Sequence, residues 1–177
     1  MSNFYTVTRF MRPLLGVIGL LFLSFHFAFG QATINPGGNP TDTRIIQRLT
    51  GTGLGITNPT LERGNRNVQI ATFTNGFAAG FGIDQGVLFS TGNATQDLQN
   101  RNNQLSISNN PGNSGADPHL TAIVSNATFN TVSYSFDITL QPEVNGIRIV
   151  FQFGSEEYPD YVGSSYNDVF GFFVSGP

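Results

Sequence analysis

The stretch that decides the fold is Val132-Ser-Tyr-Ser-Phe-Asp-Ile-Thr-Leu140. Its apolar residues, Val132, Tyr134, Phe136, Ile138 and Leu140, alternate with serine, serine, aspartate and threonine. A period of two is the pattern of a half-buried strand, because successive side chains point to opposite faces of a sheet. We therefore expect a strand here with one face in the core and one face in water.

A second alternating stretch follows directly along the chain. Pro142 and the turn-forming pair Asn145-Gly146 lead into Ile147 to Phe153, in which every odd-numbered residue is isoleucine or phenylalanine. Asn-Gly between two alternating runs is a strong signal for a hairpin. The sequence therefore predicts that this stretch pairs with the strand before it.

Three further segments are predicted to be strands. Val169 to Val174 and Val87 to Phe89 are apolar on both faces, so we expect them to lie centrally in a sheet that is covered on both sides. Val68 to Phe73 is the third. A polar connection rich in asparagine and glycine, from Thr91 to Pro118, is predicted to be a surface loop.

One short helix is predicted near the start of the folded part. Thr41 or Asp42 can cap it, and Ile45, Ile46 and Leu49 share one of its faces. Gly51 and Gly53 then end the helix.

These elements predict an all-β fold, namely a jelly-roll-like β-sandwich with a short N-terminal helix, and a barrel is the second choice. We expect one domain over residues 42–177. Because the chain stops at Ser175-Gly-Pro177, directly after a strongly apolar strand, we also expect this domain to be incomplete at its C-terminus.

The first 30 residues read as a secretory signal peptide. Arg9 and Arg12 precede an apolar run from Leu14 to Phe29, and Ala28-Phe29-Gly30 places small residues before a cut at Gln31. An uncleaved anchor is the alternative, although the run is shorter than the roughly 20 residues of a spanning helix. Residues 31–41 are predicted to be an exposed leader or linker.

Charge and composition exclude several partners. Without Arg9 and Arg12, the eight basic residues fall to six against eleven acids, a net charge of −5, and there is no cysteine. Such a chain repels nucleic acid and anionic lipid. It cannot use disulfides, thiol nucleophiles or lipidation at a cysteine. No later segment is apolar enough to insert into a membrane.

Catalytic motifs are missing from the sequence. There is no Gly-x-Ser-x-Gly elbow, and His119 is predicted to be a solvated histidine in an Asp-Pro-His loop. The glycine-rich stretches lack the spacing of phosphate-binding loops. We therefore predict a protein that is not an enzyme.

One acidic segment between the strands ending near Phe153 and starting near Val169 stands out. Its carboxylate and amide side chains are candidate ligands of Ca²⁺, a cation that prefers hard oxygen donors. These candidates are Glu156, Glu157, Asp160, Asn167 and Asp168. A hydrogen-bonded structural loop and a catalytic carboxylate pair are the alternatives.

Three tyrosines lie between these acids. Tyr158, Tyr161 and Tyr166 are candidate ligand-binding residues, because aromatic faces stack on sugar rings. The alternative is that they fix the loop to the rest of the domain.

The same residues carry a resemblance to a known family. Phe153-Gly-Ser-Glu-Glu-Tyr-Pro-Asp-Tyr-Val162 and Asn167-Asp-Val-Phe-Gly-Phe-Phe-Val-Ser-Gly-Pro177 closely resemble the signature of choice-of-anchor L domains. Gly82-Ile-Asp-Gln-Gly-Val-Leu-Phe-Ser-Thr-Gly92 is similar to the family's other recurring stretch. The chain departs from the family pattern around Asp117, where members carry more acids, and this weakens Asp117 as a metal ligand.

The resemblance implies an exported bacterial protein, Bacteroidetes-like in origin, that is secreted or held at the cell surface. We expect an adhesion or ligand-binding domain whose partner is an extracellular protein or a glycan. A carbohydrate-binding accessory module is the alternative. A glycoside or peptide hydrolase that uses Glu156 or Glu157 is a more distant one.

Overall fold

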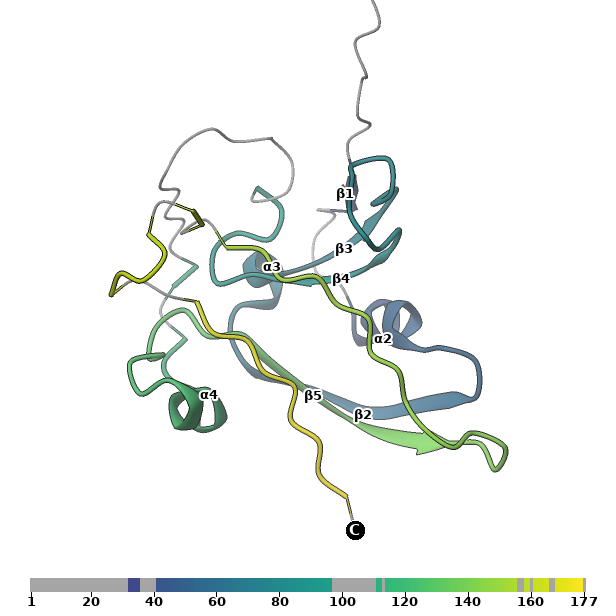
Figure 1. Cartoon of the computed structure of the whole chain (residues 1–177). Helices are drawn as coiled ribbons and strands as arrows, with labels where there is room; N and C mark the ends of the chain where they lie inside the picture. Colours follow the sequence, from purple (N-terminus) through teal and green to yellow (C-terminus); the bar gives the residue numbers. More distant parts are fainter. Residues whose placement is uncertain are drawn as a thin grey trace, which may run out of the picture.

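The computed structural model describes residues 32–35, 41–96, 111–112, 114–155, 158–159, 161–165 and 168–176. Eight elements follow one another in these residues (Figure 1). In chain order they are β1 (Thr33–Asn35), α2 (Asp42–Leu49), β2 (Leu54–Arg63), α3 (Arg66–Gln69), β3 (Ile70–Thr74), β4 (Gly86–Phe89), α4 (Pro118–Ile123) and β5 (Ser133–Leu140).

The strands form two antiparallel sheets. One sheet has the strand order β1-β3-β4, and the other pairs β2 with β5. Strands outnumber helices, and the helices are short. The predicted β-rich class is therefore confirmed.

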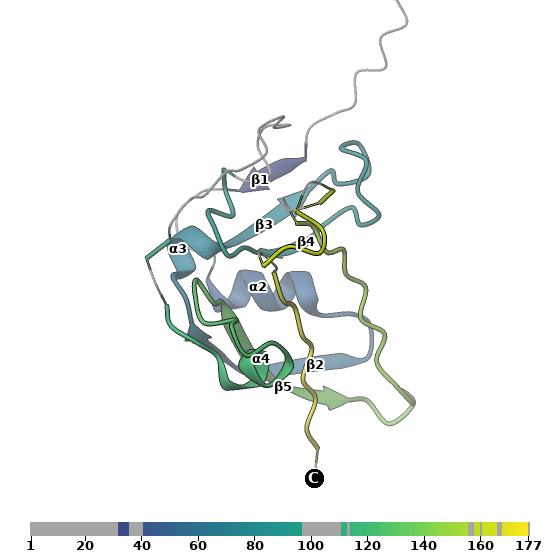
Figure 2. The same cartoon turned by 60° about the vertical axis from the view of Figure 1, so that its left-hand side comes forward.

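Helix α2 lies between the two sheets (Figures 1 and 2). The Thr41 side chain accepts a hydrogen bond from the amide of Arg44, which caps the helix as the sequence predicts. The apolar face of α2 contacts β2, β3 and β4, and Ile45 is 0% exposed. The helix thus fills the space between the sheets.

The main core lies on the three-stranded sheet. Ile34, Ala71, Phe73 and Ala94 are buried together there, and the rings of Phe73 and Phe81 meet edge to face at 6.0 Å. Although the sequence placed residues 33–35 in the leader, they form β1 and pair with β3, because Ile34 joins this core.

Strand β5 confirms the central prediction, but its partner differs from the expected one. It pairs with β2, so that Leu54 lies opposite Leu140, rather than with residues 147–153. The register shifts between Thr57 and Thr60, where Asn58 adopts a positive φ of 50°. This irregularity takes Pro59 out of the ladder, since proline has no amide to donate. It also explains why β2 was not predicted.

Strand β4 was expected to lie at the centre of a sheet. Within the described residues it pairs with β3 alone, and β3 holds the central position. β3 has a strand on each side and is almost entirely buried, so its backbone groups are satisfied.

His119 was predicted to lie in a loop, but it lies in the first turn of α4. The buried carboxylate of Asp117 accepts hydrogen bonds from the amides of His119 and Leu120, at 2.8 and 3.4 Å, and thereby caps the helix. Pro118 at the first helical position favours the same start.

In the part of the chain that the structure describes, no helix has the length and apolarity to cross a bilayer. The predicted signal peptide, residues 1–30, lies outside the described residues.

Candidate functional site

Two segments near the C-terminal end, residues 145–154 and 169–176, run in opposite directions across the molecule (Figures 1 and 2). The prediction of strands at Ile147–Phe153 and Val169–Val174 is wrong, because neither segment pairs into a sheet with any described residue. Neither segment makes a backbone-to-backbone hydrogen bond with any other described residue. Alternation alone thus produced no paired strand here.

The side chains of the two segments nevertheless meet in an antiparallel register. A step of two residues along one segment matches a step of two back along the other. The facing pairs are Ser155 with Asp168 (hydroxyl to carboxylate, 3.3 Å), Phe153 with Phe170 (ring centroids, 6.2 Å) and Phe151 with Phe172 (ring centroids, 5.8 Å). Such pairs are what stabilises neighbouring strands on one face of a sheet.

The residues between these pairs contact the rest of the fold. The side-chain oxygen of Gln152 accepts a hydrogen bond from the amide of Gly82 at 3.0 Å, in the connection between β3 and β4. The ring of Phe173 lies 4.9 Å from that of His119 on α4. The side opposite the phenylalanine pairs thus contacts the rest of the domain through Gln152 and Phe173, while Val150 and Phe173 on that side are themselves 59% and 50% exposed.

The side of the segment pair that carries the phenylalanine pairs is apolar and exposed. Its residues are between 44% and 80% exposed to solvent. We call this surface the aromatic face, and its residues are Ile149, Phe151, Phe153, Phe170, Phe172 and Val174. The ring of Phe170 also lies 5.2 Å from Phe151 and 4.9 Å from Phe172, so the four rings form one cluster.

Two of the predicted ligand-binding tyrosines, Tyr158 and Tyr161, lie in the described parts of the connection between the two segments. Tyr158 is 75% exposed and Tyr161 is 36% exposed. The amide of Ser164 donates to the carbonyl of Tyr161 at 2.9 Å, which closes a turn there. Tyr166 lies outside the described residues.

Of the predicted calcium ligands, only Asp168 lies within the described residues. Asp168 is exposed and accepts the hydrogen bond from Ser155. Glu156, Glu157, Asp160 and Asn167 lie outside the described residues. Among the side chains that the structure describes, no three acidic or histidine residues are grouped as a metal site would require. A calcium site in this loop therefore stays a prediction.

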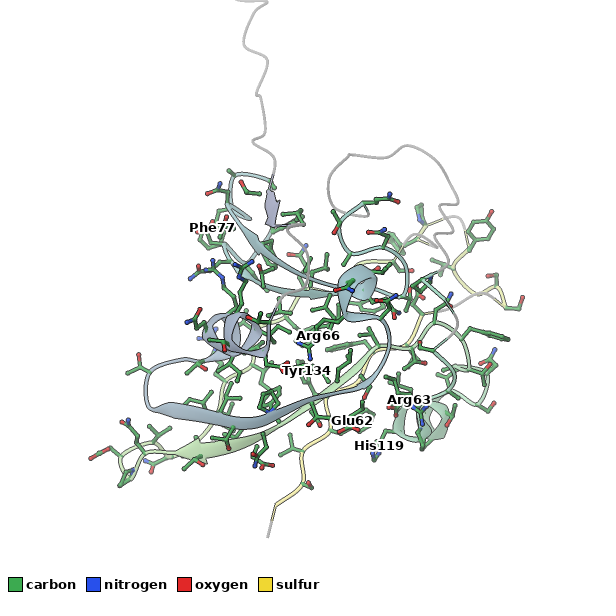
Figure 3. The ribbon with its side chains drawn as sticks, turned by 180° about the vertical axis from the view of Figure 1, so that it is seen from behind. Glu62, Arg63, Arg66, Phe77, His119 and Tyr134 are labelled. Carbon is green, nitrogen blue, oxygen red and sulfur yellow. The ribbon has the colours of Figure 1, made fainter. Side chains whose placement is uncertain are left out.

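A polar cluster that the sequence did not predict joins three elements (Figure 3). The hydroxyl of Tyr134 on β5 donates to Asp42 of α2 at 2.7 Å, and Arg66 of α3 forms an ion pair with the same carboxylate at 2.5 Å. The guanidinium of Arg66 also lies 5.8 Å from the centroid of the Tyr134 ring. We call these three residues the polar clamp.

The polar clamp shifts the protonation of its members. The hydrogen bond from Tyr134 is the main reason why the pKa of Asp42 lies below its usual value; burial opposes this shift, and Arg66 adds to it. Burial, followed by the hydrogen bond to Asp42, raises the pKa of Tyr134 to about 12. Both shifts favour the pair of an ionised carboxylate and a neutral phenol.

The clamp residues are far apart in the sequence, and for this reason no local pattern could have linked them. Tyr134 belongs to the apolar set of its strand, and Asp42 was considered only as a helix cap. The cluster joins α2, α3 and β5, so its geometry is that of a structural connection between the two sheets rather than of a catalytic site.

Comparison with known protein families identifies the family of this chain. The choice-of-anchor L domain matches residues 33–177, from β1 to the end of the aromatic face. The chain belongs to the choice-of-anchor L family. This membership confirms the resemblance and indicates a surface-associated or exported protein. No curated protein and no solved structure matches this choice-of-anchor L chain.

Proposed function

We propose that this choice-of-anchor L domain is a non-enzymatic binding domain of a secreted or surface-anchored protein, which attaches to an extracellular protein or glycan. One observation carries the proposal: in a family of surface-associated or exported proteins, this chain presents Tyr158 and Tyr161 from an exposed turn. Exposed tyrosines offer apolar contact area and a polar tip, which makes them effective at binding interfaces.

A glycan is the second candidate ligand, and the same turn favours it. Two tyrosines within four residues of one turn, one of them three-quarters exposed, can stack on the apolar faces of sugar rings. In this version of the proposal the domain is a carbohydrate-binding accessory module.

Two finer predictions belong to the proposal. The first is a jelly-roll-like sandwich, which the two antiparallel sheets on either side of α2 support. The second is a Ca²⁺ ion bound by the acidic loop, for which Asp168 is the candidate ligand within the described residues. Calcium would rigidify the turn that carries the tyrosines.

The test is binding by the exported chain to arrays of immobilised glycans and extracellular proteins, with and without Ca²⁺. We expect Tyr158→Ala combined with Tyr161→Ala to abolish binding to whichever ligand the wild type retains. Phe77→Ala is the matched control, because Phe77 is also an exposed aromatic residue but lies between β3 and β4. Binding that survives the double substitution would overturn the assignment of this turn, and turnover of a glycan or peptide would overturn the non-enzymatic proposal.

A further inference from the structure

The sequence holds two Asn-Gly pairs, Asn75-Gly76 and Asn145-Gly146, and their surroundings in the structure differ. We propose that Asn145 is a site of spontaneous chemical modification, at which the side-chain amide is lost and aspartate or isoaspartate forms, whereas the fold protects Asn75. Neither Tyr158 nor Tyr161 takes part in this reaction, so the inference is independent of the proposed function.

The reaction needs only the two residues of the pair and water. The backbone nitrogen of the glycine gives up its proton and attacks the side-chain carbonyl carbon, Cγ, of the asparagine. A nitrogen–carbon bond forms, and ammonia leaves and takes up that proton. Water then adds to either carbonyl of the resulting cyclic succinimide and opens the ring, which gives aspartate or isoaspartate. Glycine favours the attack because it has no Cβ to keep its nitrogen away.

At Asn145 no described residue holds the reacting groups. Both residues of the pair are exposed. The amide of Gly146 donates no hydrogen bond to a described residue, and the side chain of Asn145 makes none with one. A Cβ built on Gly146 would meet no atom within 4 Å apart from its chain neighbours. The backbone can therefore rotate to bring the nitrogen of Gly146 against Cγ of Asn145, and water can reach the ring that forms.

The hydrogen-bonded part of this connection ends one residue earlier. The amide of Gln141 donates to the carbonyl of Gly53 at 3.0 Å, and the amide of Val144 donates to the carbonyl of Gln141 at 2.9 Å. The side chain of Val144 lies so close to Gly53 that an added Cβ there would collide with it. Asn145 is thus the first residue beyond the turn that is fixed beside the start of β2. The predicted hairpin that would have ordered the pair does not form, because β5 pairs with β2.

At Asn75 the reacting groups are held. Gly76 is buried, and its amide donates to the carbonyl of Asp84 at 2.8 Å. The side-chain amide of Asn75 donates to the hydroxyl of Thr33 on β1 at 3.0 Å. A Cβ on Gly76 would collide with the carbonyl oxygen of Ile83, so the backbone has no room to turn. Attack at Asn75 first requires these hydrogen bonds to open, which costs free energy and slows the reaction.

The first experiment follows both asparagines in one sample. The folded chain is incubated in mildly alkaline buffer, and peptide mapping by mass spectrometry measures the conversion of Asn75 and of Asn145 against time. We expect Asn145 to convert at least about tenfold faster than Asn75, because a buried and hydrogen-bonded amide reacts only after local opening. Equal rates of conversion in the folded chain would overturn the proposal.

A parallel sample in concentrated urea separates the effect of the fold from that of the local sequence. In the unfolded chain the hydrogen bonds at Asn75 and Gly76 are absent, so both asparagines precede an accessible glycine amide. We expect the two rates of conversion to agree within a few-fold there. A preference for Asn145 in urea as large as that in the folded chain would assign the selectivity to the sequence and not to the fold, and would also overturn the proposal.

The second experiment changes the attacking residue. Gly146→Ala places a Cβ beside the nitrogen, and the fold accepts it, because the site is open and Gly146 has no positive φ. We expect this variant to convert Asn145 several-fold more slowly and Asn75 at the wild-type rate. Gly154→Ala is the matched control, since Gly154 is equally open and lies in the same segment, and it should change neither rate. Conversion of Asn145 at the wild-type rate in Gly146→Ala would rule out the succinimide route.

Discussion

Residues 132–140 and residues 147–153 carry the same alternation of apolar and polar side chains, yet they have different fates. The first becomes β5, which pairs with β2 along its length, whereas the second remains extended and without backbone partners among the described residues. Alternation states which face of a strand is apolar, but a strand also needs a neighbour to satisfy its amides and carbonyls. The comparison teaches that a partner, and not the pattern, decides where a sheet forms.

Hydrogen exchange offers the largest contrast between the paired and unpaired regions. We expect amides of β3 to exchange at least about a thousandfold more slowly than amides of residues 147–153, because only the former are held in a sheet. The measurement is hydrogen–deuterium exchange followed by mass spectrometry. Slow exchange in residues 147–153 would show that they have a backbone partner and would break the comparison.

The same substitution in the two regions should separate them next. Ile45→Ala removes a side chain that is 0% exposed and should lower the free energy of unfolding by about 2–5 kcal/mol. Ile149→Ala, its matched control on the aromatic face, should lower the free energy of unfolding by less than about 1 kcal/mol, because Ile149 is 46% exposed. Urea denaturation checks both values. A larger loss in Ile149→Ala than in Ile45→Ala would mean that the apparent core has been misplaced.

Buried and exposed glutamines provide a third, smaller contrast. Gln69 is fully buried, and its amide group accepts from the backbone of Asn65 at 2.7 Å and donates to the carbonyl of Asn130 at 2.8 Å. Gln69→Met leaves both backbone groups unpaired and should cost about 1–3 kcal/mol for each. Gln152→Met breaks one exposed hydrogen bond and should lower the free energy of unfolding by much less than Gln69→Met does. Urea denaturation measures both losses. Equal losses of unfolding free energy in the two variants would contradict the burial of Gln69.

The smallest expected effect is a pH dependence of the polar clamp. Because the pKa of Asp42 is lowered in the folded chain, the ionised carboxylate stabilises the fold at pH values above the unfolded pKa of 3.8. This stabilisation is lost as the pH falls through the folded pKa. The melting temperature of Tyr134→Phe should therefore fall less than that of the wild type between about pH 6 and about pH 3. Identical acid profiles would show that the clamp does not couple to folding.

The alkaline side of the clamp has the opposite sign. The pKa of Tyr134 is raised from 10.0 in the unfolded chain to about 12 in the folded chain. The neutral phenol therefore stabilises the fold fully below pH 10.0, and this stabilisation is lost as the pH rises from 10.0 to about 12. Absorbance of the tyrosinate ion should show one of the chain's tyrosines titrating late, and Tyr134→Phe should remove that late step.

Local signals were enough to predict several elements before the structure was known. The Thr41 cap and the apolar face around Ile45 predicted α2, and the alternation up to Leu140 predicted β5. The start of α4 also has a local signal, because Asp117 directly precedes Pro118, although the prediction for these residues is a loop. Short-range chemistry of this kind survives folding because its partners are close in sequence.

Long-range features were not predictable in the same way. Asn58 and Pro59 interrupt the pattern of β2, and the register shift that absorbs them depends on β5. The polar clamp unites Asp42, Arg66 and Tyr134 only after the two sheets are in place. For the candidate site, Tyr158 and Tyr161 are exposed as a ligand-binding role requires, whereas most of the acidic loop lies outside the described residues.

The pairing of β2 with β5 has a consequence for the order in which the nascent chain folds. β2 is complete at Arg63, but its partner begins only at Ser133, so the intervening polypeptide must be synthesised before the ladder can form. Closing so long a loop is slow relative to hairpin formation. β3 and β4 can pair early, whereas β2 presents an open edge to other chains throughout the interval. The time between the synthesis of β2 and that of β5 therefore sets how long the nascent chain is vulnerable to misassembly.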